Sequence, residues 1–312
     1  MGEFLYSILK TARPRQWLKN IALFTTIFFT GQLFDQKLFL SSFLGFIAFC
    51  FLASSNYFIN DILDAPSDKK HPFKKFRPIA SGKLSITNAV IASMMFLILG
   101  LSISYKLGLN FLLLSTLFIS LQYMYSLYLK KISVIDILVI TAGYFIRVYA
   151  GEAATGYHIS VWVGLAALSL ALFLAIGKRR AELTLIQRYK GVIPQDTRIT
   201  LTGYSEKLLD TYTAMFANST FITYALYTFL ERPVGKGFLF HNYSKFIDVM
   251  VSRKWLMTSI PFVLYGIMRY MQLIYEGKGE SPEKVLTSDL PLLSTVVLWG
   301  ATVFLIIYGI GG

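Results

Sequence analysis

The sequence predicts an all-α, polytopic membrane protein. Hydrophobic residues make up 55% of the 312 residues and charged residues 15%, with a mean hydropathy of +0.56. An ordinary soluble domain is less apolar and carries more charge. The apolar residues gather in stretches of roughly 20 residues, the length at which a helix crosses the hydrocarbon core. Since backbone groups in lipid need internal partners, and the alternation typical of a membrane barrel does not occur in the sequence, these stretches are expected to be helices.

Nine apolar stretches are long enough to cross a bilayer. They cover residues 17–34, 38–59, 85–105, 109–127, 134–151, 160–177, 211–230, 255–275 and 290–310. The sequence therefore predicts a bundle of nine transmembrane helices around a central cavity open to the cytoplasmic side. We expect a single transmembrane domain over residues 1–312, with a cytoplasmic cap formed by the loops at 60–84, 128–134 and 178–210. The N-terminal segment lacks a long apolar core and a small-residue cleavage site, so no removable signal peptide is expected.

Basic residues set the expected orientation. If the N-terminus is cytoplasmic, the inside segments hold 21 of the 30 Lys and Arg residues and the outside loops hold 7. The excess of positive charge on cytoplasmic loops places the N-terminus and the charged motifs in the cytoplasm and the C-terminus outside, in the cell membrane. The same bias accounts for the net charge of +13. No nucleic-acid partner is expected, because the sequence contains no aromatic and basic RNA motif and no DNA-binding helix pattern.

The most informative stretch runs from Asn60 to Gly82. Its carboxylates Asp61, Asp64 and Asp68 are three and four residues apart, a spacing that places all three on one face of a helix. Mg²⁺ typically takes one or two protein carboxylates and completes its shell with water and substrate phosphate oxygens. The three aspartates are therefore the predicted Mg²⁺ ligands and catalytic residues.

Cations follow these carboxylates directly. Carboxylates repel phosphate oxygens, so an acidic cluster beside a basic one indicates a hard cation that bridges to an anionic substrate, with Lys and Arg on the remaining charge. Lys74 and Arg77 are the predicted substrate-binding cations of this stretch, and Asn60 is expected to bind or to orient a ligand. The alternative is a solvated loop with a generic positive surplus, which we disfavour because the acidic and basic motifs occur together.

Pro66 interrupts the acidic motif. Its ring clashes with the carbonyl four residues earlier in a helix. The helix is therefore expected to end or kink near Ala65, which makes Asp68 the least secure metal ligand.

Three further clusters supply candidate substrate-binding residues. They are Arg13, Arg15 and Lys19 near the N-terminus; Tyr125, Lys130, Lys131 and Asp136 around the fourth loop; and Lys178 and Arg179 after the sixth stretch. For each cluster a membrane role is the alternative, because cations at helix ends anchor to anionic headgroups and a carboxylate is favoured at a helix N-terminus. Near the N-terminus, Gln16 and Asn20 favour a site, since amides are poor choices on a lipid-facing turn. Lys178, Arg179 and Arg180 point about 100° apart on a helix, so only Lys178 and one arginine are expected to share a pocket.

Arg147 lies well inside the fifth apolar stretch. An ionisable group there should face the bundle interior and pair with another group. It follows Asp136 by eleven residues, about 16 Å along an ideal helix, so direct pairing with Asp136 is not expected. We expect Arg147 to lie nearer the outer end, with Glu152 as a candidate partner, and to be structural.

Taken together, these motifs resemble the UbiA superfamily of intramembrane prenyltransferases. The pattern NDxxDxxxD after the second stretch carries the resemblance. The segments RPRQWLKN, HPxKxxRPIASG, YSLYLK, IRVYAG, GKRRAEL and GESPE, in this order along the chain, are similar to its decaprenyl-phosphate phosphoribosyltransferase branch. The resemblance implies a Mg²⁺-dependent transfer of 5-phosphoribosyl from phosphoribosyl diphosphate (PRPP) to a polyprenyl phosphate, with release of diphosphate. The chain departs from the superfamily pattern at Pro66 and in a second motif with a single carboxylate, Asp136.

Two other functions compete with this one. A UbiA-type enzyme could instead move a prenyl group from a prenyl diphosphate to an aromatic or other small acceptor, and would use the same aspartates. A transporter or lipid flippase would show repeated halves and paired broken helices around a midplane site, and the sequence shows neither clearly.

Overall fold

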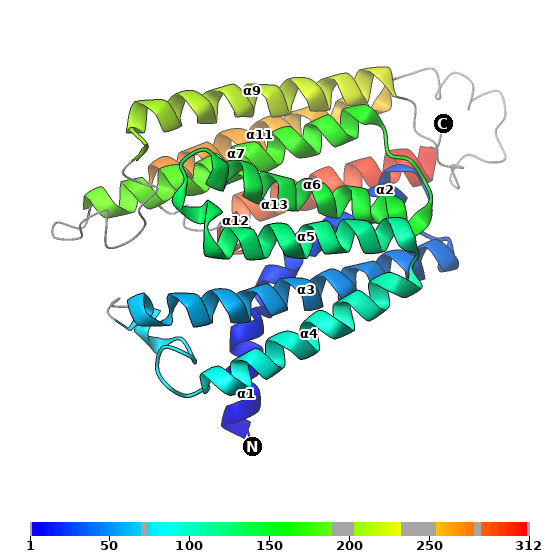
Figure 1. Cartoon of the computed structure of the whole chain (residues 1–312). Coiled ribbons are helices and arrows are strands. Elements are labelled where there is room, and N and C mark those ends of the chain that lie inside the picture. Colours follow the sequence, from blue (N-terminus) through cyan, green and yellow to red (C-terminus); the bar gives the residue numbers. More distant parts are fainter. Residues whose placement is uncertain (1, 70–73, 189–202, 232–253, 278–281, 311–312) are drawn as a thin grey trace. The chain divides into compact units, whose positions relative to one another are not determined.

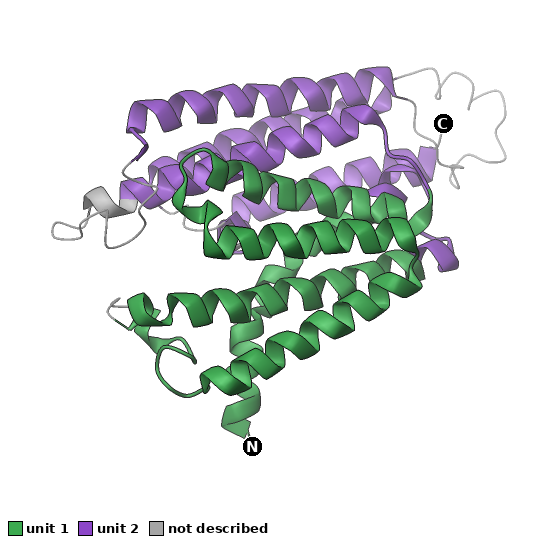
Figure 2. Ribbon diagram, viewed as in Figure 1, with its two compact units in different colours: residues 1–24, 40–156 green, residues 25–39, 157–312 purple. Residues whose placement is uncertain are grey.

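The computed structural model describes residues 2–69, 74–188, 203–231, 254–277 and 282–310. Every regular element within this part of the chain is a helix (Figure 1). The chain divides into two compact units (Figure 2). Unit 1 comprises residues 1–24 and 40–156, and unit 2 comprises residues 25–39 and 157–312.

Six helices in the described residues are long and apolar enough to cross a membrane. They are α3 (Gln36–Asp68), α4 (Ile86–Lys106), α5 (Leu109–Leu127), α6 (Ile135–Thr155), α7 (Val161–Arg188) and α13 (Leu290–Phe304), which continues as a π-helical segment, η6 (Leu305–Ile310). These helices confirm the all-α class and a multi-pass membrane protein. They correspond to six of the nine predicted stretches.

The other three stretches are helical but do not meet the same requirement of length and hydropathy. Residues 211–230 fall in α9 (Glu206–Leu230), and 255–275 fall in η5 (Trp255–Ser259) and α11 (Ile260–Tyr275). The prediction of one regular helix over 17–34 is wrong. That stretch contains a 3₁₀ helix, η1 (Pro14–Phe24), and one turn of α-helix, α2 (Thr25–Phe29). The short elements α1 (Gly2–Ala12), η2 (Lys74–Phe76), η3 (Leu129–Lys131) and α12 (Pro282–Ser288) complete the described chain.

Helices α3 and α7 both extend beyond the predicted stretches. Helix α3 continues through Pro66 to Asp68, and the Lys69 amide still donates to the Ala65 carbonyl at 3.2 Å. Pro66 removes only one backbone hydrogen bond. It lies in the last turn, where few further intrahelical hydrogen bonds follow. Helix α7 runs eleven residues beyond position 177, so the start of the predicted loop at 178–210 is helical.

Unit 1 packs an aromatic core between α3, α5 and α6. Phe49 lies 4.9 Å from Phe118 and 5.7 Å from Phe111, measured between ring centroids, and all three side chains are fully buried. Hydrogen bonds also join the helices. The Ser55 and Ser93 hydroxyls each donate to the backbone carbonyl of the other residue, at 2.9 and 3.0 Å. Such reciprocal bonds hold α3 against α4, because apolar packing alone discriminates poorly between protein and lipid.

Unit 2 packs α7, α9, α11 and α13 against one another. Gly177 on α7 lets the helix approach Tyr270 and Ile274 on α11, since a Cβ at this position would lie 2.5 Å from Ile274 Cδ1 and 3.0 Å from Tyr270 Cε1. Helices α11 and α13 are joined by a bidentate ion pair in which Arg269 donates to Asp289 at 2.7 and 3.1 Å. Asp289 also caps α13, because its carboxylate accepts from the Leu292 amide at 2.9 Å.

Candidate active site

The C-terminal end of α3 carries the three aspartates of the acidic motif. The i, i+3 and i+7 spacing places them on one face of the helix. Asp61 and Asp68 are each only 3% exposed, whereas the Asp64 side chain is 30% exposed. Buried carboxylates are costly unless they are paired and hydrogen-bonded, so the cations around them define the site.

Arg77 bridges two of the carboxylates. Its Nη1 lies 2.6 Å from Asp68 Oδ2 and 3.2 Å from Asp61 Oδ1. Arg77 directly follows η2, and its amide donates to the Lys74 carbonyl at 2.9 Å. The chain then turns through Gly82, which has a φ of +79° that suits glycine, and enters α4.

Arg13 reaches the same carboxylate from the N-terminal segment. Its Nη2 lies 2.5 Å from Asp61 Oδ1, and its guanidinium lies 5.0 Å from the Tyr57 ring centroid. The backbone of Arg13 is left-handed, with a φ of +54°, immediately after the end of α1. A glycine usually occupies this position, because a Cβ makes it unfavourable by about 1 kcal/mol. This unfavourable backbone conformation of Arg13 brings its guanidinium to Asp61.

Lys130 and Asn60 enclose the third carboxylate. Lys130 Nζ lies 2.7 Å from Asp64 Oδ1 and 3.2 Å from Asn60 Oδ1. Asn60 Nδ2 donates to Asp64 Oδ2 at 2.9 Å. Asn60 therefore orients the Asp64 side chain, one turn further along α3. Lys130 lies in η3, between the end of α5 and the start of α6.

Unit 1 thus joins three carboxylates to three cations from separate segments of the chain. In the described residues, no three His, Cys, Asp or Glu side chains are close enough to hold a metal ion together. Mg²⁺ does not require three, because phosphate and water oxygens complete its shell. The donor set of two or three carboxylates and an amide has the hard oxygen chemistry that suits this ion, and the cations can donate to phosphate oxygens.

The other predicted residues of unit 1 lie on the elements that carry these cations. Arg15 and Lys19 are in η1, directly after Arg13; Lys74 begins η2, before Arg77; Tyr125 is in the last turn of α5; Lys131 follows Lys130 in η3; and Asp136 is in the first turn of α6, fully buried. Arg13, Arg77, Lys130 and Asn60 have the ion pairs and hydrogen bonds to the aspartates described above.

The basic cluster at the end of the sixth predicted stretch lies in unit 2. Arg179 is completely buried in α7, and its Nη1 donates to Glu182 at 2.8 Å. Arg180 Nε lies 2.6 Å from Asp210 Oδ1 on α9, and its guanidinium lies 5.2 Å from the Tyr275 ring centroid on α11. The three helices are joined through Arg180, which is therefore structural. Lys178, the other predicted residue of this cluster, also lies in α7.

Sequence reasoning missed two features of unit 1. Tyr57 precedes Asp61 by four residues, so its i, i+4 spacing could have placed it beneath Arg13. The partner of Arg147 could not be found in this way. Arg147 is buried, as predicted, and its Nε donates to Asn20 Oδ1 at 2.6 Å, across 127 residues of sequence. Asn20 is buried and accepts this hydrogen bond, which explains the presence of an amide in this stretch without a substrate contact.

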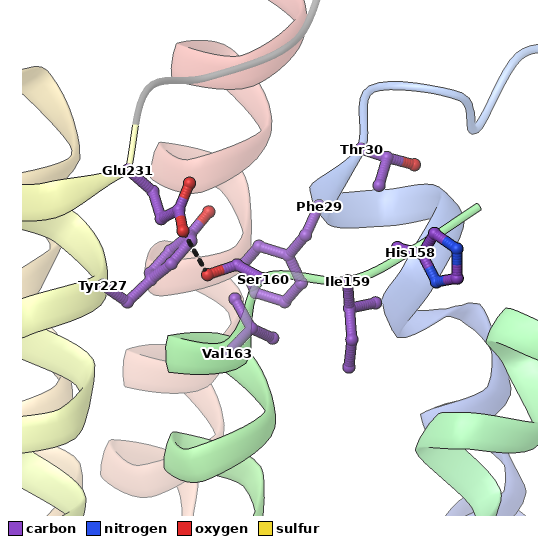
Figure 3. Close-up of a pocket in the computed structure, with 8 residues that line it drawn as sticks. All are labelled: Phe29, Thr30, His158, Ile159, Ser160, Val163, Tyr227 and Glu231. Atoms are coloured by element: carbon purple, nitrogen blue, oxygen red, sulfur yellow. Dashed lines mark hydrogen bonds between the residues drawn. The ribbon is translucent and has the colours of Figure 1, made fainter.

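Unit 2 contains a pocket that none of the predicted site residues lines (Figure 3). Its volume is about 220 Å³. The lining residues come from α2 and the turn after it, from the segment before α7 and the first turn of α7, and from the end of α9 and the residue that follows it: Phe29, Thr30, His158, Ile159, Ser160, Val163, Tyr227 and Glu231. Ser160 donates to Glu231 Oε1 at 2.6 Å, so the carboxylate of the pocket is already hydrogen-bonded within the protein.

Comparison with known proteins assigns the chain to a family. The model of the UbiA prenyltransferase family matches residues 21–181. The decaprenyl-phosphate phosphoribosyltransferase of Corynebacterium glutamicum is 31% identical over 306 residues, which cover 96% of this chain and 86% of the relative. The protein of the same name from Mycolicibacterium smegmatis is 30% identical, over 96% of this chain and 92% of the relative.

Solved structures show the same fold. A UbiA homolog from Archaeoglobus fulgidus bound to GPP and Mg²⁺ matches with a TM-score of 0.70 at 19% identity, covering 96% of this chain and 99% of that chain. The same homolog bound to Cd²⁺ matches with a TM-score of 0.65. Structure and sequence agree, and the chain belongs to the UbiA prenyltransferase family.

Proposed function

We propose that this protein transfers 5-phosphoribosyl from PRPP to a polyprenyl phosphate of the decaprenyl type and releases diphosphate. The similarity to two decaprenyl-phosphate phosphoribosyltransferases over 96% of the chain supports this activity. The single structural observation that carries it is the cluster of Asp61, Asp64 and Asp68 with Arg13, Arg77 and Lys130. The proposed enzyme is therefore a Mg²⁺-dependent pentosyltransferase.

Asp61, Asp64 and Asp68 are the proposed metal-holding residues. Mg²⁺ would neutralise the diphosphate charge that grows as the C1–O bond of the ribose breaks. Asn60 would keep the Asp64 carboxylate oriented toward the ion. Arg77 already binds Asp61 and Asp68, so it would stay within reach of the same diphosphate.

The reaction must also bring two negatively charged phosphates together, and the cations of the site are suited to this. The acceptor is the phosphate oxygen of the lipid, which attacks C1 of the ribose while diphosphate leaves with the electron pair. Because this oxygen is already anionic, no strong general base is required. Arg13, Arg77 and Lys130 can donate N–H groups to phosphate oxygens and screen the repulsion. The remaining proposed substrate-binding residues are Arg15, Lys19, Lys74, Tyr125, Lys131, Asp136, Lys178 and Arg179.

The proposed setting is a cell membrane, with the site on the cytoplasmic side. PRPP is water-soluble and its acceptor is a lipid, so the reaction needs a site at the membrane surface. The distribution of Lys and Arg supports a cytoplasmic N-terminus and an outside C-terminus. A single domain over residues 1–312, with nine spans around a central cavity, remains part of the proposal.

The direct test incubates purified protein with Mg²⁺, PRPP and a polyprenyl phosphate, and measures diphosphate release and the lipid-linked phosphoribosyl product. We expect product with both substrates and none when either is omitted. Asp61→Asn is the matched inactive control. Diphosphate release from a prenyl diphosphate and a small aromatic acceptor, without any from PRPP, would replace this proposal with the prenyltransferase alternative.

A further inference from the structure

The 3₁₀ helix η1 is unusual for its length. It covers eleven residues, from Pro14 to Phe24, whereas 3₁₀ runs longer than three or four residues are uncommon because their hydrogen-bond geometry is poor. Such a segment needs contacts outside itself to remain in place. Within unit 1 these contacts are made at two levels, one at each end of η1.

In its C-terminal half, η1 is held by α6 and α3. Arg147 Nε donates to Asn20 Oδ1 at 2.6 Å, and Asn20 Nδ2 contacts Cys50 Sγ at 3.2 Å. Arg147 is itself fixed, since its Nη1 donates to the Gly143 carbonyl at 2.6 Å and its guanidinium lies 4.6 Å from the Phe118 ring centroid. One residue pair, Asn20 and Arg147, therefore connects η1 to two transmembrane helices.

The backbones also touch at this level. A Cβ placed on Gly151 of α6 would collide with the Leu23 carbonyl of η1. Arg147 and Gly151 are one helical turn apart, so the hydrogen bond and the close backbone contact occupy the same face of α6.

At the N-terminal end of η1, the contacts lead to the acidic cluster. Trp17 Nε1 donates to Ser54 Oγ at 3.1 Å, and Ser54 Oγ donates to the Ala12 carbonyl at 3.0 Å. The next residue, Arg13, has the left-handed backbone and pairs with Asp61. The location of the Arg13 guanidinium thus depends on where η1 is docked.

We propose that Asn20 and Arg147 are positioning residues, which dock η1 on α3 and α6 and thereby fix Arg13 at Asp61. Arg147 is buried, and no carboxylate in the described part of the chain forms a salt bridge with it. A cation without a counter-ion is costly at this depth, and its retention is explained by the amide and carbonyl that it holds. The docking itself is independent of the reaction, whereas its effect on catalysis rests on the proposed function.

Cys50 provides the test, because it is the only cysteine of the chain, is 1% exposed and touches Asn20. The rate at which a maleimide modifies Cys50 in the purified, folded protein reports whether η1 stays docked. We expect Arg147→Met to speed this modification by about tenfold, the factor expected for loss of one hydrogen bond to a charged group. Asn20→Ala should act in the same direction, and Arg147→Lys should restore part of the protection.

Ser115→Ala is the matched control. It removes a buried hydrogen bond between α4 and α5 in the same unit, 2.9 Å long, without touching η1. Cys50 should remain as protected in this variant as in the wild type. If Arg147→Met does not yield folded protein, Asn20→Ala decides the question alone, since Arg147 keeps its contacts to Gly143 and Phe118 in that variant.

Kinetics then test the positioning role. The KM for PRPP should rise in Arg147→Met and in Arg13→Gln, with a smaller change in kcat. In the double variant, the second substitution should raise this KM little further, because both act through the Arg13 guanidinium. Wild-type protection of Cys50 in both Arg147→Met and Asn20→Ala, or fully additive effects with Arg13→Gln, would overturn the proposal. If Cys50 is modified faster in the variants but the wild-type protein does not use PRPP, the inference that Asn20 and Arg147 dock η1 stands, and the proposed function is refuted instead.

Discussion

The ammonium of Lys130 lies 2.7 Å from the carboxylate of Asp64, although 66 residues separate them in the sequence. This pair joins the loop after α5 to the end of α3. Asp64 is the most exposed of the three carboxylates, with 30% of its side chain accessible, and the Lys130 side chain is 18% exposed. A cation in this position is available to a substrate phosphate as well as to Asp64.

Replacing Lys130 should therefore weaken substrate binding more than folding. We expect Lys130→Met to raise the KM for PRPP by about tenfold or more, since a hydrogen bond to a charged group contributes about 1.5–3 kcal/mol. The melting temperature should change little, because a partly exposed ion pair stabilises a protein by about 1 kcal/mol or less. Lys106→Met, at the C-terminal end of α4, is the control; a similar rise in KM there would show that the effect is general.

The three aspartates should not be equivalent. Asp61 lies between two arginines, whereas Asp68 contacts Arg77. Asp61→Asn should reduce turnover by at least about 100-fold, because it removes a proposed metal ligand and leaves both guanidinium groups without this carboxylate. Asp68→Asn should cost less, about tenfold, because Asp68 is the least secure of the proposed metal ligands and its charge-assisted hydrogen bond to Arg77 would be weakened. Steady-state turnover of the two folded variants, compared at saturating Mg²⁺, measures the difference; equal losses would contradict this ranking.

Pro66 offers a test of the helix end. Because α3 continues past this residue, Pro66→Ala should restore the missing hydrogen bond to the Ile62 carbonyl. The gain in stability should be smaller than the roughly 3 kcal/mol that proline costs in a helix interior, since Pro66 lies in the last turn. We expect a higher melting temperature and retained activity. A lower melting temperature would mean that the proline is needed where it stands.

Arg180 should be a structural residue and not a substrate ligand. Its guanidinium joins α7 to Asp210 and Glu206 on α9 and to the Tyr275 ring on α11. Arg180→Met should lower the free energy of unfolding by about 1–2 kcal/mol, a value below the range for fully buried pairs because both carboxylates are partly exposed. Thermal unfolding should show the loss, while the KM for PRPP measured at a permissive temperature stays unchanged. A selective rise in this KM would instead assign Arg180 to the substrate.

Removal of divalent metal should abolish activity without unfolding the protein. The carboxylates of the cluster are paired with the protein's own cations, so the site does not require a metal ion to balance its charge. After treatment with a chelator we expect no diphosphate release, full recovery when Mg²⁺ is added, and an unchanged circular dichroism spectrum. A large loss of helix signal on chelation would show that the metal is structural.

The acidic motif of the candidate site could be predicted because its residues lie within a few helical turns of one another. The spacing of Asp61, Asp64 and Asp68 predicts a common helix face, and the basic residues that follow predict an anionic substrate. The end of α3 could not be predicted from Pro66, because the cost of a proline depends on how many helical residues follow it. The first stretch was equally misleading, since hydropathy measures apolar character and does not distinguish a 3₁₀ helix from an α-helix.

By itself, then, the sequence determined the all-α membrane class, the family resemblance and the acidic cluster, because each depends on composition or on spacing within a few turns. Only the tertiary structure decided which cation serves which carboxylate, and that Arg147 binds Asn20. These contacts join residues 48, 66 and 127 positions apart, for Arg13 with Asp61, Lys130 with Asp64 and Arg147 with Asn20. Such pairs depend on how the helices pack, and no local pattern in the chain records that packing.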